Sequence, residues 1–225
     1  RQPQRHHLGA HLVAGPRKAL QQPTYWDDAR AHLMKRDRVL RKLLPKYQQG
    51  MLESRGDAFV TLARSIVGQQ ISVRAAQAVW DRCEAALPRF TPKQVVAIEP
   101  TALRAAGLSQ RKVEYIQDLA QHFVDGRLHA KQWQHMDDEA IIRELVTVRG
   151  IGRWTAEMFL IFYLLRPDVL PLDDIGLLAG ISQLYFSGEA VSRSEAREVA
   201  QAWAPYRSVA TWYIWRSLDP LPVAY

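Results

Sequence analysis

Cysteine is almost missing from this sequence: Cys83 is the only one among 225 residues. A single thiol excludes an intramolecular disulfide, and it excludes any all-cysteine metal site, including an iron–sulfur cluster, within one chain. Proteins of oxidising compartments tend to use paired cysteines, so this composition favours a reducing compartment. We therefore expect an intracellular protein.

Long hydrophobic runs are also missing. The longest apolar stretch, from about Met158 to Leu165, is far shorter than the roughly 18 residues from which a membrane-spanning helix is inferred. The first twenty residues contain no hydrophobic segment followed by a small-residue cleavage site, as a signal peptide would. We expect a cytoplasmic protein that does not enter a membrane.

The alternation of apolar and polar residues that marks β-strands never extends beyond a few residues. Apolar residues instead recur at helical spacing between Gly and Pro interruptions, which predicts an all-α fold. Residues 1–23 lack this periodicity and are predicted to be a loose N-terminal arm, with one helical domain over 24–225. The predicted helices lie within 24–45, 57–70, 73–87, 91–98, 99–107, 109–126, 137–148, 154–165, 192–205 and 207–218, with another apolar helical run after Asp174.

Positive charge exceeds negative charge. The net charge is +7 and the isoelectric point is near 9.7. Such a balance favours a polyanionic partner such as a nucleic acid, although a membrane surface or an acidic protein would satisfy the same charge.

The stretch VRGIG, residues 148–152, separates two helical patterns and predicts a helix–hairpin–helix over 145–156. Gly150 and Gly152 allow a tight turn, and Ile151 can fill the groove between the helices. The N–H groups that begin the second helix would then form a site for a DNA phosphate. An ordinary corner between two helices, with Gly as C-cap, explains the fragment equally well.

Asp173 and Asp174 follow a Pro turn and precede an apolar helical run. The commonest role of Asp at that position is to cap the helix, but a helix N-terminus also suits a catalytic carboxylate. One residue can serve both purposes.

Four stretches together resemble the helix–hairpin–helix, Gly/Pro–Asp superfamily of DNA base-excision glycosylases. They are VRGIGRWTAEMFLIF, LPLDDIGL, SIVGQQISVRAAQAVW and PYRSVATWYIW. Within it the sequence is most similar to bacterial 3-methyladenine DNA glycosylase II and the yeast alkylpurine glycosylases, from about Pro23 to the end. The resemblance implies a two-lobed helical glycosylase fold with its active site in the cleft between the lobes.

The resemblance also implies a role for individual residues. Asp174 is the catalytic carboxylate, which stabilises an oxocarbenium-like sugar and orients a water. Aromatic side chains hold the flipped cationic base, and a wedge fills the gap left in the duplex. The implied base pocket is Trp154, Trp215, Trp212 and Tyr163, the wedge is Gln70 with Gln69, and the phosphate-binding hairpin is Gly150, Ile151, Gly152, Arg153 and Thr155.

Members that also cut the strand carry a Lys two residues after the second hairpin Gly, where this sequence has Trp154. Without that amine no Schiff base forms, so the resemblance implies a monofunctional enzyme. It implies no required cofactor, but a structural Na⁺ or K⁺ held by the backbone carbonyls of Val146, Val148 and Ile151. The expected partner is damaged double-stranded DNA, bound by a monomer at the nucleoid of a bacterium or archaeon.

The sequence departs from the family pattern in two ways, and two other functions remain open. The bacterial enzyme has an extra N-terminal β-domain for which the chain has no room before residue 23, which predicts a more open pocket, and Gln70 is polar where some members carry an apolar wedge. A glycosylase for neutral deaminated or oxidised bases would need hydrogen-bonding groups in its pocket. A non-catalytic helix–hairpin–helix DNA-binding protein would bind duplex without releasing a base.

Overall fold

The computed structural model describes residues 22–54 and 56–218. This part of the chain forms twelve α-helices and three short 3₁₀ helices, without a β-sheet, so the all-α prediction is confirmed. The predicted N-terminal arm, 1–23, lies outside the described residues except for its last two. The helices are α1 Trp26–Arg36, α2 Arg38–Leu43, η1 Leu44–Lys46, α3 Ala58–Val67, α4 Val73–Ala85, α5 Pro92–Ala97, α6 Pro100–Ala105, α7 Gln110–Val124, η2 Trp133–His135, α8 Asp138–Leu145, α9 Arg153–Phe162, α10 Ile175–Tyr185, α11 Arg193–Val199, η3 Ala200–Trp203 and α12 Arg207–Leu218.

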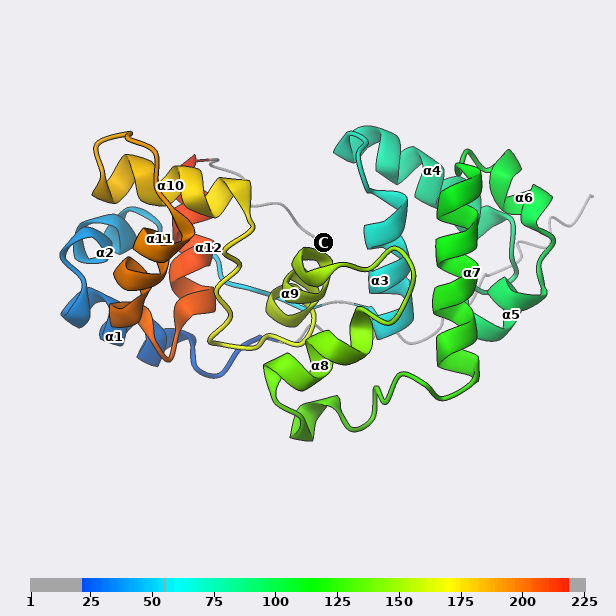
Figure 1. Ribbon diagram of the computed structural model, residues 1–225, viewed down its shortest axis with the longest axis horizontal. Helices are drawn as coiled ribbons and strands as arrows, with labels where there is room; N and C mark the ends of the chain where they lie inside the picture. The colour runs from blue at the N-terminus through cyan, green and yellow to red at the C-terminus, as the bar shows by residue number, and fades with distance from the viewer. Residues whose placement is uncertain (1–21, 55, 219–225) are drawn as a thin grey trace, which may run out of the picture.

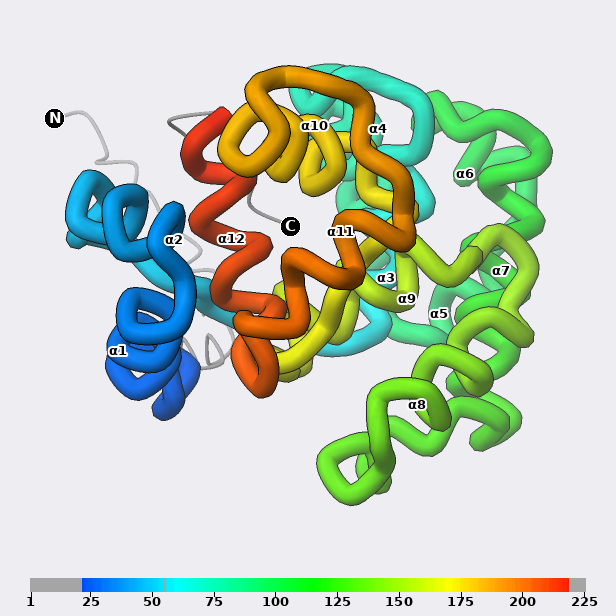
Figure 2. The backbone as a smooth tube through the Cα atoms, turned by 60° about the vertical axis from the view of Figure 1, so that its left-hand side comes forward, coloured from blue at the N-terminus to red at the C-terminus, as the bar shows by residue number. Residues whose placement is uncertain are grey.

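The helices form two groups that lie side by side (Figure 1). One group contains α1 and α2 together with α10, α11 and α12, so both ends of the described chain contribute to it. The other contains α3 to α7, in which α7 packs against α3, α5 and α6. Helix α9 lies between the groups, where it contacts α3 and α8. Figure 2 shows the same division from another side, with α12 passing between α10 and the α1–α2 pair.

Local sequence signals set most helix boundaries. Phe59, Leu62, Ala63, Ile66 and Val67 recur at helical spacing and form the buried face of α3. The Ser72 hydroxyl accepts a hydrogen bond from Ala75 N and so caps α4, and the Asp137 carboxylate caps α8 in the same way through Ala140 N. Each capping oxygen satisfies an N–H group that has no partner within its helix.

The single helix predicted over 24–45 is wrong, because the chain breaks at Asp37. Its backbone is extended (φ −134°, ψ 120°), and its Oδ1 accepts hydrogen bonds from Val39 N (2.8 Å) and Leu40 N (3.0 Å), which start α2. Its Oδ2 accepts from the Tyr185 hydroxyl (2.7 Å) and from Trp203 Nε1 (2.9 Å). These partners come from α10 and η3, so tertiary contacts stabilise a break that the local sequence does not require.

In the part of the chain that the structure describes, no helix combines the length and the apolar character needed to cross a membrane.

Candidate active site

Asp174 lies directly before α10, as the N-cap residue of that helix. A turn that places Asp174 N against Pro171 O (3.0 Å) precedes it, and its Oδ2 caps the helix by accepting from Leu177 N (2.7 Å). The residue is only 9% exposed. The capping role predicted from its position is therefore confirmed.

Two tryptophans donate to the same carboxylate. Trp154, at the start of α9, donates from Nε1 to Oδ1 (2.9 Å), and Trp215, on α12, donates from Nε1 to Oδ2 (2.7 Å). A carboxylate accepts about four hydrogen bonds, and with Leu177 N three donors are in place here. One acceptor direction on Oδ1 is left for a further partner. The ionised form satisfies all three donors, because each donates to an acceptor-only group.

Neighbouring side chains fix both rings. Trp215 stacks on Phe162 with ring centroids 5.6 Å apart and planes 8° apart. A Cβ on Gly176 would lie 3.2 Å from Asp174 Oδ2, a tight contact, and 3.4 Å from Trp215 Cδ1, so glycine leaves room beside the carboxylate that the indole binds. Trp154 keeps 37% of its surface exposed. An aromatic face beside the carboxylate is thus open to a ligand.

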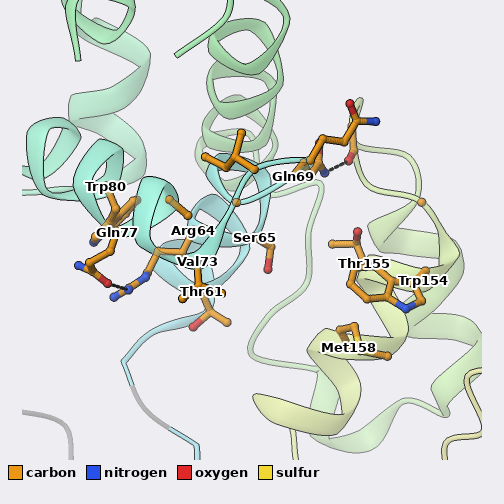
Figure 3. Close-up of a pocket in the computed structure, with 16 residues that line it drawn as sticks. Thr61, Arg64, Ser65, Gln69, Val73, Gln77, Trp80, Trp154, Thr155 and Met158 are labelled. Atoms are coloured by element: carbon orange, nitrogen blue, oxygen red, sulfur yellow. Dashed lines mark hydrogen bonds between the residues drawn. The ribbon is translucent and has the colours of Figure 1, made fainter. Parts of the chain in front are cut away.

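A cleft of about 610 Å³ adjoins Trp154. Figure 3 shows Trp154, Thr155 and Met158 of α9 on one side, and residues of α3 and α4 on the other. The α3 wall carries Thr61, Arg64 and Ser65, with the Arg64 guanidinium over the Trp80 ring (5.4 Å) and bonded to Gln77 Oε1 (2.7 Å). The cleft therefore has an aromatic and apolar side and a polar side.

The predicted wedge residues line this cleft, in the loop between α3 and α4. Gln70 is exposed and has a positive φ of 60°, which is uncommon for a residue other than glycine. The Gln69 side chain does not point outward, since its Nε2 donates to Gly150 O (2.8 Å). The structure thus presents Gln70 at the tip of the loop and uses Gln69 to join the loop to the hairpin.

The predicted hairpin joins α8 to α9, and its geometry suits an anion. Ile151 is 4% exposed between the two helices, as expected. Gly152 is the N-cap of α9 without a side-chain cap, and a Cβ there would meet nothing within 4 Å. The first N–H groups of α9 therefore have no side-chain cap, and a helix N-terminus of this kind suits a phosphate. Thr155 lies one turn further, 8% exposed, in the cleft wall.

Arg153 is engaged within the protein. Its Nη1 and Nη2 donate to the Glu139 carboxylate of α8 (3.0 and 2.5 Å). The side chain is still 48% exposed, and its contact with a DNA phosphate stays a prediction.

Two predicted pocket residues lie elsewhere. Trp212 is 3% exposed, and its ring packs edge-on against Trp26 and Tyr213, so it belongs to the core rather than to an open pocket. Tyr163 follows Trp154 by nine residues, about 13 Å along α9. It stacks on Phe159 (4.9 Å). Burial raises the pKa of its hydroxyl, Asp57 before α3 raises it further, and a backbone hydrogen bond with Ala58 lowers it. The base-pocket prediction is wrong for Trp212, and the structure does not bring Tyr163 to Asp174.

Some site residues were not found from the sequence. Thr61, Arg64 and Ser65 occupy the polar side of α3, whose apolar side alone indicated a helix. Phe162 ends the stretch VRGIGRWTAEMFLIF but was given no role there, and its place two turns after Thr155 puts it toward Trp215. Within residues 22–54 and 56–218, no three His, Cys, Asp or Glu side chains gather as metal ligands would.

A buried carboxyl lies one turn below Trp154. The Glu157 side chain is 4% exposed, and its Oε2 lies 3.7 Å from Arg153 Nε. The other charged groups around it are Glu139 of α8, Asp173 of the loop before α10 and Arg193 of α11. Burial raises the pKa of the Glu157 carboxyl from 4.5 to about 7, although the Arg153 guanidinium lowers it.

This shift predicts the pH dependence of stability. Because the pKa is higher in the folded protein than in the unfolded chain, the free energy of unfolding falls as the pH rises from 4.5 to about 7, by roughly 3 kcal/mol. We expect Glu157→Gln to have nearly the wild-type melting temperature at about pH 4.5 and to exceed it above about pH 7, by about 5–10 °C. Thermal unfolding across this range measures the difference. Glu139→Gln is the control and should show no such gain. Its carboxyl is exposed, and the hydrogen bond from Arg153 lowers its pKa. A Glu157→Gln difference that does not vary with pH contradicts the prediction.

Comparison with known proteins places this geometry in a family. Residues 63–205 match the model of the HhH-GPD superfamily base excision DNA repair proteins. The crystal structure of a DNA-3-methyladenine glycosidase from Bacillus halodurans superposes on this chain with a TM-score of 0.80. The two sequences are 35% identical, and the superposition covers 85% of this chain and 89% of the glycosidase chain.

A second relative comes from Schizosaccharomyces pombe. The sequence of its DNA-3-methyladenine glycosylase 1 is 29% identical over 78% of this chain and 79% of its own length. The structure of the 3-methyladenine DNA glycosylase from that yeast, in complex with abasic DNA, covers 84% of this chain and 96% of its own with a TM-score of 0.72. By the match over most of its length, this chain belongs to the HhH-GPD superfamily of base excision DNA repair proteins.

Proposed function

We propose that this chain is a monofunctional DNA glycosylase of the 3-methyladenine DNA glycosylase II type, which removes alkylated purines from duplex DNA in base excision repair. The observation that carries the proposal is the Asp174 carboxylate held by the indole N–H groups of Trp154 and Trp215. It joins a fixed negative charge to aromatic surfaces at the rim of a cleft. The relatives named above, with their 3-methyladenine substrates, support the same substrate class.

Alkylation determines which chemistry the site must perform. A purine alkylated on a ring nitrogen carries positive charge, which already weakens its glycosidic bond. The exposed face of Trp154 suits such a cation, since a cation over an indole gains roughly 0.5–2 kcal/mol. Recognition by aromatic faces thus favours the base that is easiest to release.

The reaction is a hydrolysis of the bond between C1′ and the purine nitrogen. The base leaves with the bonding electron pair, and the sugar becomes oxocarbenium-like. Asp174 stabilises this positive charge, and its unoccupied acceptor direction can hold the attacking water. The water gives its oxygen to C1′ and its proton passes to the solvent, while the alkylated purine leaves as a neutral base. Because three donors hold the carboxylate before reaction, it needs no reorganisation when charge develops.

The residue at position 154 supports the absence of lyase chemistry. Trp154 stands at the first turn of α9 with its Nε1 directed at Asp174, where a lyase would need an amine that attacks C1′. We therefore propose that the product is an intact abasic site.

DNA binding combines the hairpin and the wedge loop. The open N-terminus of α9 binds a phosphate without reading sequence, and Gln70 enters the duplex when the nucleotide leaves it. We propose that carbonyl oxygens of Val146, Val148 and Ile151 hold Na⁺ or K⁺ beside that phosphate. The proposal is supported by the position of the Val148 carbonyl in the hairpin turn, where it accepts from Ile151 N (3.2 Å), and by the preference of hard cations for oxygen. We further propose a cytoplasmic monomer.

The test is the release of bases from methylated duplex DNA. We expect the wild-type protein to release 3-methyladenine, identified by chromatography, and to leave strands that break only after hot alkali. Breaks without alkali would contradict the monofunctional assignment. Duplexes containing hypoxanthine or 8-oxoguanine test the neutral-base alternative, which the Ser65 hydroxyl in the cleft wall would favour. Binding without release of any base would instead indicate a non-catalytic DNA-binding protein.

A further inference from the structure

Helix α7 places a lysine under the wedge loop. Lys112, in the first turn of α7, donates from Nζ to Val67 O (2.8 Å) and to Gln69 O (2.7 Å). Val67 is the last residue of α3, and Gln69 directly precedes the wedge residue Gln70. Side chains of this kind satisfy carbonyls that helix ends leave without partners. The ammonium therefore fixes the point at which α3 ends and the wedge loop begins.

The same helix supports the hairpin. Asp118 of α7 accepts from Arg149 N at Oδ2 (2.9 Å), and the Tyr115 ring lies against Gly150, where a Cβ would be only 2.4 Å from Tyr115 Cδ2. Gln69 closes the link by donating to Gly150 O (2.8 Å). The two DNA-contacting segments thus share one support, although about eighty residues separate them in the sequence.

The backbone conformation of Gln70 explains why the loop needs this support. Its φ of 60° costs roughly 1–3 kcal/mol for a residue other than glycine, and such a conformation persists only where its surroundings fix it. Lys112 binds the carbonyl immediately before it. A wedge that enters a duplex must also keep the bases from stacking again, because the loss of base stacking costs a few kcal/mol.

We propose that Lys112 is a positioning residue for base flipping: it holds the wedge loop in the strained form that enters the duplex, at a fixed distance from the phosphate-binding hairpin. The inference rests on the proposed glycosylase function and deepens it. Lys112 touches neither the base nor the sugar in this arrangement. Its loss should therefore affect the extrusion of a nucleotide and not the chemistry that follows.

The test compares DNA that must be flipped with DNA that is already unstacked. We expect Lys112→Met to lower the rate of 3-methyladenine release from methylated duplex at least tenfold, and to lower release from the corresponding methylated single strand, which needs no heating, less than threefold. Lys112→Arg, which retains donors for the two carbonyls, should recover most of the duplex activity. Lys93→Met removes the same charge from α5, which packs on α7, and is the matched control.

A second measurement needs no base release. In a duplex with 2-aminopurine next to a tetrahydrofuran abasic analogue, unstacking by the wedge raises fluorescence. We expect wild type and Lys93→Met to raise it and Lys112→Met to fail, at protein concentrations that saturate the DNA. A wild type that raises fluorescence without releasing any base would refute the proposed function while leaving this inference supported.

Other outcomes overturn the inference. Equal losses on duplex and single-stranded DNA would show that Lys112 acts on chemistry or stability. A lower affinity for undamaged duplex, with the salt dependence reduced by about one counterion and normal 2-aminopurine fluorescence at saturation, would show a phosphate contact instead. If Lys112→Met melts below the assay temperature, Gln69→Met, which removes the donor to Gly150 O while leaving Lys112 in place, must show the same duplex-selective loss or the inference fails.

Discussion

Asp174→Asn should reduce the release of 3-methyladenine from methylated duplex by roughly 10³-fold, the order expected when a preorganised electrostatic group is lost. The substitution removes the negative charge that faces the oxocarbenium-like sugar. It also places an N–H₂ group where an oxygen now accepts from Trp154 or Trp215, so one indole N–H loses its acceptor. Single-turnover release, measured with enzyme in excess, follows this step directly.

The variant should still fold. Asn caps a helix about as well as Asp, so the bond to Leu177 N can survive through Oδ1. Asp173→Asn is the matched control, because Asp173 is the adjacent carboxylate but pairs with Arg193 (2.5 Å). We expect that control to stay within threefold of wild type. Release by Asp174→Asn within tenfold of wild type, with both proteins folded by circular dichroism, would remove Asp174 from the mechanism.

The signals that predict the helices act over short stretches of sequence. The same limit decides which site residues could be predicted. Apolar spacing and capping residues such as Ser72 and Asp137 act within a few positions, so the sequence indicates the ends of α4 and α8 closely. The break at Asp37 depends on Tyr185 and Trp203, almost 150 residues or more away. No local pattern contains that information.

The tryptophans of α12 show the same limit. Trp212 and Trp215 are three residues apart and chemically identical, but one packs against α1 and the other donates to Asp174. Helix α12 is buried continuously from Ser208 to Ile214, so it lacks the polar face that would reveal its rotation. Family resemblance predicted Asp174, Trp154 and Trp215 together, whereas the separation of Trp212 from the pocket required the structure.

Gly150→Ala is expected to destabilise the protein by roughly 3 kcal/mol. Gly150 has φ +90°, where an L side chain is strained by about 1–2 kcal/mol. Its Cβ would also lie 2.4 Å from Tyr115 Cδ2 and 2.5 Å from Cγ, and such overpacking adds about 1–3 kcal/mol. Urea unfolding, followed by tryptophan fluorescence, measures the change.

The neighbouring glycine provides the control for this substitution. Gly152 has φ −94°, and a Cβ there meets no atom within 4 Å, so Gly152→Ala should cost no more than about 1 kcal/mol, the loss expected at an N-cap. Combining Gly150→Ala with Tyr115→Ala separates the two causes at Gly150, since removal of the ring relieves the overlap but not the backbone strain. The double variant should lose clearly less stability than the sum of the two single variants. Additive losses would mean that backbone strain alone makes glycine necessary, and that Tyr115 does not set how closely α7 supports the hairpin.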